Sequence, residues 1–230
     1  MHNKFKNNIT KIQPIVIMNN NTISIYIDFK SPYAYLAIKP SKQFAKDLKL
    51  EINWLPYVLD IPGYLGSAKV DNKGKVLESN RNDHQWRRVR YSYMDCRRYA
   101  NLRKVTVLGP QKIWNTRLVS IALLWVKKQN PLLVEDFIDH IFVNFWKREL
   151  DIENFDIVET IIEKCGISLS GFKEWEKSAG KKELDVIMNE AHKKGVFGVP
   201  SYLVEDELFW GREQIPLIRA KITGNYEEVI

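Results

Sequence analysis

Ser31 is the residue whose type and position most directly suggest chemistry. It follows an apolar segment at residues 23–29 and precedes Pro32. A Ser-Pro pair is a typical helix start, with serine as the N-cap and proline in the first turn. A helix N-terminus offers unpaired N–H groups and about half a positive charge, so a thiolate or another anion beside Ser31 would be stabilised. The alternative is that Ser31 only caps its helix.

A second candidate lies at Val199 and Pro200, directly before an apolar segment at residues 202–205. A cis peptide bond before Pro200 would leave the backbone of Val199 unpaired. An unpaired, extended backbone can bind a peptide-like ligand as a neighbouring strand would. The alternative is an ordinary trans proline at the start of a strand.

A third candidate is the segment Trp210-Gly211-Arg212-Glu213, where a predicted strand gives way to the last helix. Free N–H groups at residues 212 and 213 could hold a carboxylate, and the Glu213 side chain could hold an ammonium group. Taken alone, the segment is no better a signal than a helix cap.

The elements that must position these segments form two halves of one sheet. Residues 23–59 show the pattern of strand, helix and strand, which predicts a right-handed unit with parallel strands. Residues 197–222 show two short strands around Asp206 and a closing helix. A single four-stranded sheet built from both halves would bring the three candidate segments to one place.

Residues 60–196 separate these halves and are predicted to form a large all-helical insertion. Its first part, residues 60–79, is rich in Gly, Pro, Asn and Asp, which indicates a long loop that could act as a lid or a binding loop. Helical periodicity follows in five segments, at residues 84–102, 113–128, 132–149, 155–165 and 169–194. Gly180 is predicted to interrupt the last of them, and residues 1–22 are predicted to be a disordered extension.

Composition narrows the classes of function. The formal charge is +7, and the densest basic stretch, residues 87–104, carries interleaved tyrosines, but no nucleic-acid-binding motif lies there, so a solvated helix face is the preferred interpretation. Cys96 and Cys165 belong to no C-x-x-C pair, and the four histidines lack metal-ligand spacing, so neither a disulfide framework nor a metal site is expected. No signal-peptide core or membrane-spanning run is present, and a cytoplasmic protein is expected.

The three candidate segments together resemble a known family. The pattern Asp-Phe-x-Ser-Pro-Tyr-x-Tyr-Leu begins at Asp28, Val-Phe-Gly-Val-Pro-Ser begins at Val196, and Phe-Trp-Gly begins at Phe209. These motifs are similar to those of 2-hydroxychromene-2-carboxylate isomerase and the kappa-class glutathione transferases, in the DsbA-like branch of the thioredoxin fold. The resemblance spans residues 23–222. It implies an α/β, thioredoxin-like fold whose two halves, residues 23–59 and 197–222, bracket the helical insertion.

The resemblance also implies glutathione as the cofactor. Ser31 would donate a hydrogen bond to the glutathione sulfur, and Val199, beside a cis Pro200, would pair its backbone with the cysteinyl part. The γ-glutamyl end would be lined by Trp210, Gly211, Arg212 and Glu213.

A looser match covers the substrate side of the implied site. It makes Asn80 a further glutathione contact, and Arg81 and Tyr33 contacts of a small unsaturated substrate that could bear a carboxylate. Two departures from the family stand out. This chain has Arg212-Glu213 where the isomerases have Asn-Asp, and its residues 60–79 do not match theirs, so the substrate is expected to differ.

Four functions remain open at this point. The first is a glutathione-dependent isomerase, in which a thiolate held at Ser31 adds to the substrate and leaves again, and the second is a kappa-like glutathione transferase. The third, a DsbA-like oxidoreductase, is disfavoured because Ser31 and Ala34 stand at the two thiol positions. The fourth is a non-catalytic module that binds glutathione. The resemblance leaves room for a homodimer.

Overall fold

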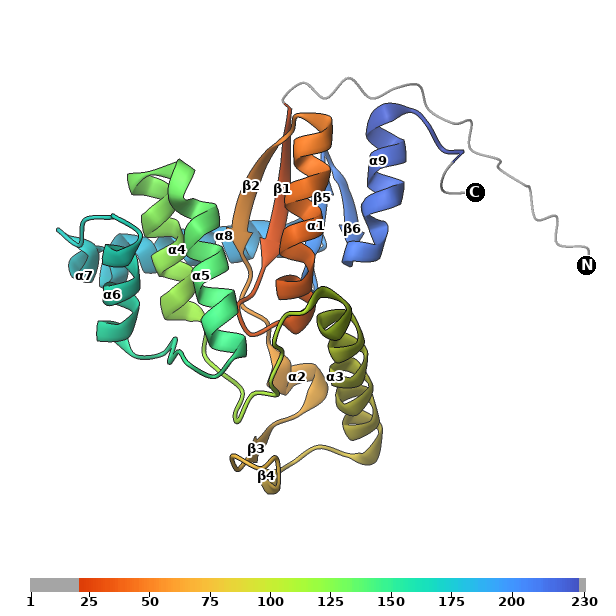
Figure 1. Ribbon diagram of the computed structural model, residues 1–230. Helices are drawn as coiled ribbons and strands as arrows, with labels where there is room; N and C mark the ends of the chain where they lie inside the picture. The colour runs from red at the N-terminus through yellow and green to blue at the C-terminus, as the bar shows by residue number, and fades with distance from the viewer. Residues whose placement is uncertain (1–20, 228–230) are drawn as a thin grey trace, which may run out of the picture.

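The computed structural model describes residues 21–227 of the chain, and Figure 1 shows their arrangement. The predicted disordered extension at residues 1–22 therefore falls outside the described residues, apart from its last two positions. Thr22, the last of them, already belongs to the first strand.

A four-stranded mixed sheet forms the centre of the fold, in the order β2-β1-β5-β6. Strand β1 (Thr22–Ile27) pairs in parallel with β2 (Glu51–Pro56) and antiparallel with β5 (Ser201–Val204), which pairs antiparallel with β6 (Glu207–Trp210). Helix α1 (Pro32–Leu48) connects β1 to β2, and α9 (Ile215–Thr223) follows β6 after a short 3-10 turn, η3 (Arg212–Gln214). The predicted βαβ and ββα halves and their single sheet are confirmed.

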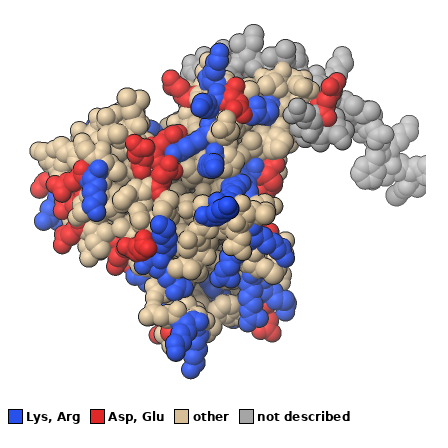
Figure 2. All heavy atoms as spheres, in the orientation of Figure 1, with Lys and Arg blue, Asp and Glu red and all other residues tan. Residues whose placement is uncertain are grey.

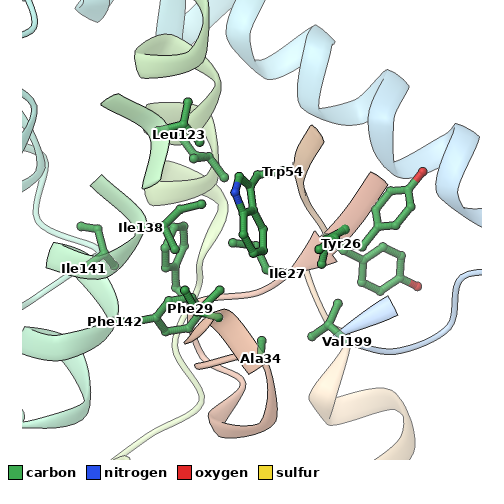
Figure 3. Packing of buried hydrophobic residues seen from close by; sticks show 14 of the residues in the cluster. Tyr26, Ile27, Phe29, Ala34, Trp54, Leu123, Ile138, Ile141, Phe142 and Val199 are labelled. Atoms are coloured by element: carbon green, nitrogen blue, oxygen red, sulfur yellow. The ribbon is translucent and has the colours of Figure 1, made fainter. Parts of the chain in front are cut away.

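Five helices of the insertion pack together next to β2, at the left of Figure 1. They are α4 (Arg117–Gln129), α5 (Val134–Trp146), α6 (Phe155–Lys164), α7 (Phe172–Trp175) and α8 (Lys181–Lys193), with a 3-10 turn, η1 (Pro131–Leu133), before α5. Phe29, just after β1, joins the two layers, because its ring lies 5.0 Å from that of Phe142 in α5 (Figure 3).

The prediction that Gly180 interrupts the helical segment at residues 169–194 is wrong. The chain continues from α7 through a π-helical turn, η2 (Glu176–Gly180), into α8. A Cβ atom at Gly180 would lie 2.6 Å from the Trp175 ring and 2.9 Å from a methyl group of Ile121. This glycine is therefore explained by close packing inside a continuous helix and not by a turn.

The remaining part of the insertion projects below the sheet in Figure 1 and is not wholly helical. The predicted loop at residues 60–79 contains a short helix, α2 (Ile61–Leu65), and a two-stranded hairpin, β3 (Ala68–Val70) and β4 (Val76–Ser79). Asp71 shapes the hairpin turn, because one of its carboxylate oxygens accepts hydrogen bonds from the N–H groups of Lys73 (2.8 Å) and Lys75 (2.9 Å).

Helix α3 (Asp83–Arg103) faces the hairpin across this projecting part. It begins with a capping box in which Asn82 and Gln85 each accept a hydrogen bond from the other's backbone N–H. Only Cys96 and Ala100 of this helix are buried. Within residues 21–227, no helix has the length and apolar character needed to cross a membrane.

Candidate functional site

A cleft of about 1490 Å³ opens between the sheet and the projecting part of the insertion. The start of α1, the segment before β5 and the β6–η3 junction form one wall, and α2, the β3–β4 hairpin and α3 form the others. Nine of the ten predicted site residues line this cleft: Ser31, Tyr33, Arg81, Val199, Pro200, Trp210, Gly211, Arg212 and Glu213. Segments far apart in the sequence are thus brought together as expected.

Ser31 occupies the N-cap position of α1. Its Oγ accepts a hydrogen bond from the N–H of Ala34 at 3.2 Å, and its own N–H donates to the carbonyl of Asp28 at 2.9 Å. The residue is 5% exposed and borders the cleft. Because the cap uses an oxygen lone pair, the hydroxyl proton stays available to a ligand. The two interpretations of Ser31, cap and ligand-binding residue, are therefore compatible.

The Val199-Pro200 peptide bond is cis, as predicted. Val199 is buried, and the hydrogen bonds found among residues 21–227 include none to its backbone N–H or carbonyl. The carbonyl of Pro200 accepts a hydrogen bond from the N–H of Gly211 at 2.9 Å, which ties this segment to the β6–η3 junction. Buried backbone groups normally have partners, so the edge at Val199 is suited to pairing with a peptide-like ligand.

Two aromatic side chains form the rim of the cleft beside Val199. The rings of Phe197 and Trp210 lie 4.9 Å apart, and both side chains are more than half exposed. Gly198 lies beneath the indole, because a Cβ atom there would come within 2.6 Å of Trp210 Nε1. A side chain at residue 198 would therefore displace this rim.

Arg212 places a cation inside the cleft. Its guanidinium carbon lies 3.6 Å from the centre of the Tyr99 ring, a cation–π contact, and its Nη1 is buried without a hydrogen-bond partner among the described residues. An unpaired buried donor is costly, and a carboxylate would satisfy it. The departure from the family's Asn-Asp pair thus adds an anion-binding group to this end of the cleft.

Arg81 and Asn80 separate in the structure although they are neighbours in sequence. Arg81 borders the cleft, where its Nε donates to the carbonyl of Leu65 at 3.0 Å and its guanidinium lies 5.0 Å from the Trp86 ring centre. Asn80 does not line the cleft: its side-chain oxygen accepts a hydrogen bond from the N–H of Ser67 at 2.7 Å, at the base of the hairpin. The residue predicted to contact glutathione is therefore engaged in holding the hairpin.

Tyr33 and Cys96 lie at the junction of α1 and α3. The Tyr33 hydroxyl donates a hydrogen bond to a carboxylate oxygen of Asp95 at 3.3 Å, and burial raises its pKa. Cys96 is fully buried, and burial raises the pKa of its thiol to about 12 despite the nearby Arg97 and Arg212. This cysteine is a core residue and not an activated thiol.

Lys30 and Asp28 form a buried ion pair that the sequence analysis did not single out. The ammonium of Lys30 lies 3.5 Å from a carboxylate oxygen of Asp28, and the two side chains are 7% and 0% exposed. The same carboxylate accepts hydrogen bonds from the N–H groups of Leu59 (2.7 Å) and Lys30 (3.2 Å). Burial raises the pKa of Asp28, while the Lys30 ammonium opposes that effect. Lys30 borders the cleft and Asp28 does not.

The cleft as a whole is electropositive. Seven lysines and arginines line it against two acids, Asp95 and Glu213. Figure 2 shows Lys and Arg side chains gathered over the lower part of the molecule, where α3 and the hairpin lie. Such a cleft attracts anionic ligands. No cluster of three or more metal-ligating side chains was found in the described part of the chain.

The residues present fit glutathione, a tripeptide with two carboxylates, an ammonium group and a thiol. The unpaired backbone of Val199 can pair with its cysteinyl unit, and the orphaned Nη1 of Arg212 can bind a carboxylate. Glu213, exposed in the same cleft, can bind the ammonium group, and Ser31 can donate to the sulfur.

Comparisons with known proteins agree with this fold. The sequence profile of the DSBA-like thioredoxin domain family matches residues 22–223. 2-Hydroxychromene-2-carboxylate isomerase from Sphingobium xenophagum is 26% identical over 204 residues, which cover 86% of this chain and 96% of that protein.

Solved structures add a second kind of similarity. The structure of a 2-hydroxychromene-2-carboxylate isomerase superposes with a TM-score of 0.68 at 21% identity, covering 90% of this chain and 97% of the other. A probable DsbA oxidoreductase from Streptomyces coelicolor superposes with a TM-score of 0.67 at 15% identity, covering 90% of each chain. The fold by itself therefore suits either chemistry, and the site must decide between them.

Proposed function

Because the chain belongs to the DSBA-like thioredoxin domain family and its curated relatives are named 2-hydroxychromene-2-carboxylate isomerases, we propose that it is a glutathione-dependent isomerase of that type. The observation that carries the proposal is the meeting of Ser31, the unpaired Val199 backbone and Arg212 in one electropositive cleft. The substrate would be a small unsaturated compound, and a carboxylate on it would suit the basic lining.

Each residue has a task that its geometry allows. The Ser31 hydroxyl donates to the ligand sulfur, and the start of α1 adds the partial positive charge of a helix N-terminus. Val199 fixes the ligand backbone along the cis-proline segment, while Arg212 binds a carboxylate through its unpaired Nη1. When bound, glutathione would supply a thiolate nucleophile beside Ser31, and an isomerisation would release this thiol unchanged.

Arg81 and the apolar side chains of the projecting part form the substrate end of the cleft. Arg81 is anchored by the carbonyl of Leu65, so its position is fixed before substrate binds. Tyr64 of α2 and Val76 of the hairpin line the same region and provide an apolar surface for an unsaturated or aromatic compound.

A kappa-like glutathione transferase is the second candidate, because the same site makes a stable conjugate when the sulfur does not leave. A stable glutathione adduct of the product would identify that activity. A disulfide oxidoreductase lacks support here, since the only cysteine close to the cleft, Cys96, is buried with a raised pKa.

The proposal is tested by titrating reduced glutathione and following its thiolate absorbance against pH. Wild-type protein is expected to bind glutathione and to lower its thiol pKa below the free value of about 8.5. Ser31→Ala is expected to raise the pKa of the bound thiol and to lower turnover of the substrate. The first compound to assay is 2-hydroxychromene-2-carboxylate, after which the relatives are named.

Asn154→Ala is the matched control, because Asn154 caps α6 through a hydrogen bond of the same 3.2 Å length and does not border the cleft. Both variants are expected to lose about 1 kcal/mol of stability through the missing cap. Only Ser31→Ala should change the pKa of the bound thiol. Absence of binding by the wild type, or equal thiol titrations in all three proteins, would refute the proposed role of Ser31.

A further inference from the structure

The two partners of the ion pair between Lys30 and Asp28 differ in their position relative to the cleft. Lys30 borders the cleft, whereas Asp28 is completely buried behind it and contributes nothing to the lining. Both partners flank the turn that ends at Ser31, because Asp28 also accepts the N–H of Lys30 through its carboxylate and the N–H of Ser31 through its backbone carbonyl. The positively charged partner of the pair therefore belongs to the cleft lining next to Ser31, and the negatively charged partner does not.

The backbone around this pair is fixed. The Asp28 carboxylate binds the N–H groups of Leu59 and Lys30, so it joins the end of β1 to the segment that follows β2. The Lys30 side chain is 7% exposed, which leaves its ammonium little freedom. A cation held in place in a poorly hydrated position acts on a neighbouring charge more strongly than a solvated lysine does.

We infer that Lys30 is a second anion-stabilising residue of the site, whose ammonium holds the thiolate of a glutathione bound at Ser31. This inference rests on the proposed function for the identity of the ligand. It assigns to this chain a fixed cation in addition to the Ser31 hydroxyl and the start of α1. Asp28 acts as a positioning residue, since it reaches the ligand only through Lys30 and the Ser31 turn.

Other charged groups that line the cleft belong to different elements and are unchanged in the variants below. Arg88, Arg90, Arg97 and Asp95 belong to α3, Arg81 and Lys112 lie in connecting segments, and Arg212 and Glu213 belong to η3. Tyr64 of α2, whose pKa is raised to about 12 mainly by burial and further by the Asp28 charge, stays protonated near neutral pH. These groups affect the pKa of the bound thiol equally in every variant. Differences in that pKa between variants therefore report on the ion pair.

The test measures the pKa of bound glutathione by thiolate absorbance in Lys30→Met, Lys30→Arg, Asp28→Asn and the double variant Asp28→Asn/Lys30→Met. Lys30→Met is expected to raise the thiol pKa by about one unit, a tenfold loss of thiolate relative to thiol, and Lys30→Arg to restore it. Asp28→Asn should lower the pKa, because it leaves the cation unopposed. The double variant buries no lone charge and therefore guards against misfolding. It should raise the thiol pKa, but by less than Lys30→Met does.

Lys42→Met is the matched control, since Lys42 lies on α1, pairs with Asp139 at 2.8 Å and does not line the cleft. Binding of S-methylglutathione, which has no thiol, provides a second measurement. Lys30→Met should weaken its binding much less than that of glutathione at a pH where the bound thiol is ionised.

These measurements distinguish a failure of the proposed function from a failure of the role assigned to Lys30. If wild-type protein binds no glutathione, the proposed function fails and this inference fails with it. If wild-type protein binds glutathione with a lowered thiol pKa, but Lys30→Met and Asp28→Asn leave that pKa unchanged or shift it in the same direction, the ion pair is purely structural. The proposed function then stands while the role of Lys30 is overturned.

Discussion

At the scale of the residue, Ser31 shows how a helix cap and a ligand contact coexist. Its oxygen accepts the Ala34 N–H while its proton stays free. Lys30, the preceding residue, lines the same cleft. A serine cannot form a mixed disulfide, so a thiol bound here can leave unchanged. This property suits the reversible addition of the proposed function and does not suit redox exchange.

Cys96 allows a sharp prediction at this scale. Burial raises its thiol pKa to about 12, so only a very small fraction is thiolate at pH values near 8, and that fraction grows only as the pH approaches the raised pKa. In a Cys165→Ser background we expect Cys96 to resist a disulfide reagent in native protein and to react fully in urea. Cys165, which is partly exposed, serves as the comparison in Cys96→Ser. Rapid labelling of native Cys96 would contradict its burial.

At the scale of the element, the β3–β4 hairpin and α3 convert a thioredoxin-like sheet into a walled cleft. The hairpin is held at its base by Asn80 and at its turn by Asp71, which leaves Val70 and Val76 to line the cleft. In the proposed function the hairpin contributes to the substrate end, whereas the glutathione contacts that line the cleft belong to other elements. Substitutions in the hairpin should therefore affect binding of the substrate and leave binding of glutathione nearly unchanged.

Val76 and Leu77 provide matched variants of this hairpin. Val76 borders the cleft, while Leu77 next to it does not and is 63% exposed. We expect Val76→Ser to raise the KM for the unsaturated substrate about threefold or more through lost apolar contact, with the Kd for glutathione nearly unchanged. Leu77→Ser should change neither constant. Equal effects of the two variants on KM would show that the hairpin does not touch the substrate.

At the scale of the whole molecule, the positive charge is concentrated where it can act on a ligand. The chain carries a formal charge of +7, and the cleft gathers seven cations against two acids. Fields of this kind raise the local concentration of anions and are screened by salt over about 10 Å at 0.1 M.

Binding of glutathione should therefore weaken with ionic strength. We expect the calorimetric Kd to rise several-fold between about 0.05 M and about 0.5 M salt, because the cleft potential is screened. Arg97→Met removes a charge from the cleft and should reduce this slope, whereas Arg98→Met removes one from outside the lining and should reduce it less. A Kd independent of salt would mean that contact geometry alone, and not the field of the cleft, determines affinity.

The sequence by itself determined the sheet and the three segments that converge at its end. These features depend on local chemistry: the strand and helix periodicities, the Ser-Pro helix start, and the motif around Pro200, whose peptide bond is cis as predicted. The helical insertion was equally visible, because long amphipathic helices carry a strong periodic signal.

Only the tertiary structure decided the rest of the site. The hairpin at residues 68–79 has strands too short for a clear alternating pattern, so its pairing and its Asp71 turn were visible only in the fold. At the end of that hairpin the Asn80 side chain binds the N–H of Ser67, whereas Arg81 lines the cleft. The proposed role of Lys30 and the raised thiol pKa of Cys96 depend on burial. Burial is created by segments distant in sequence, which set the local dielectric and therefore the strength of each charge.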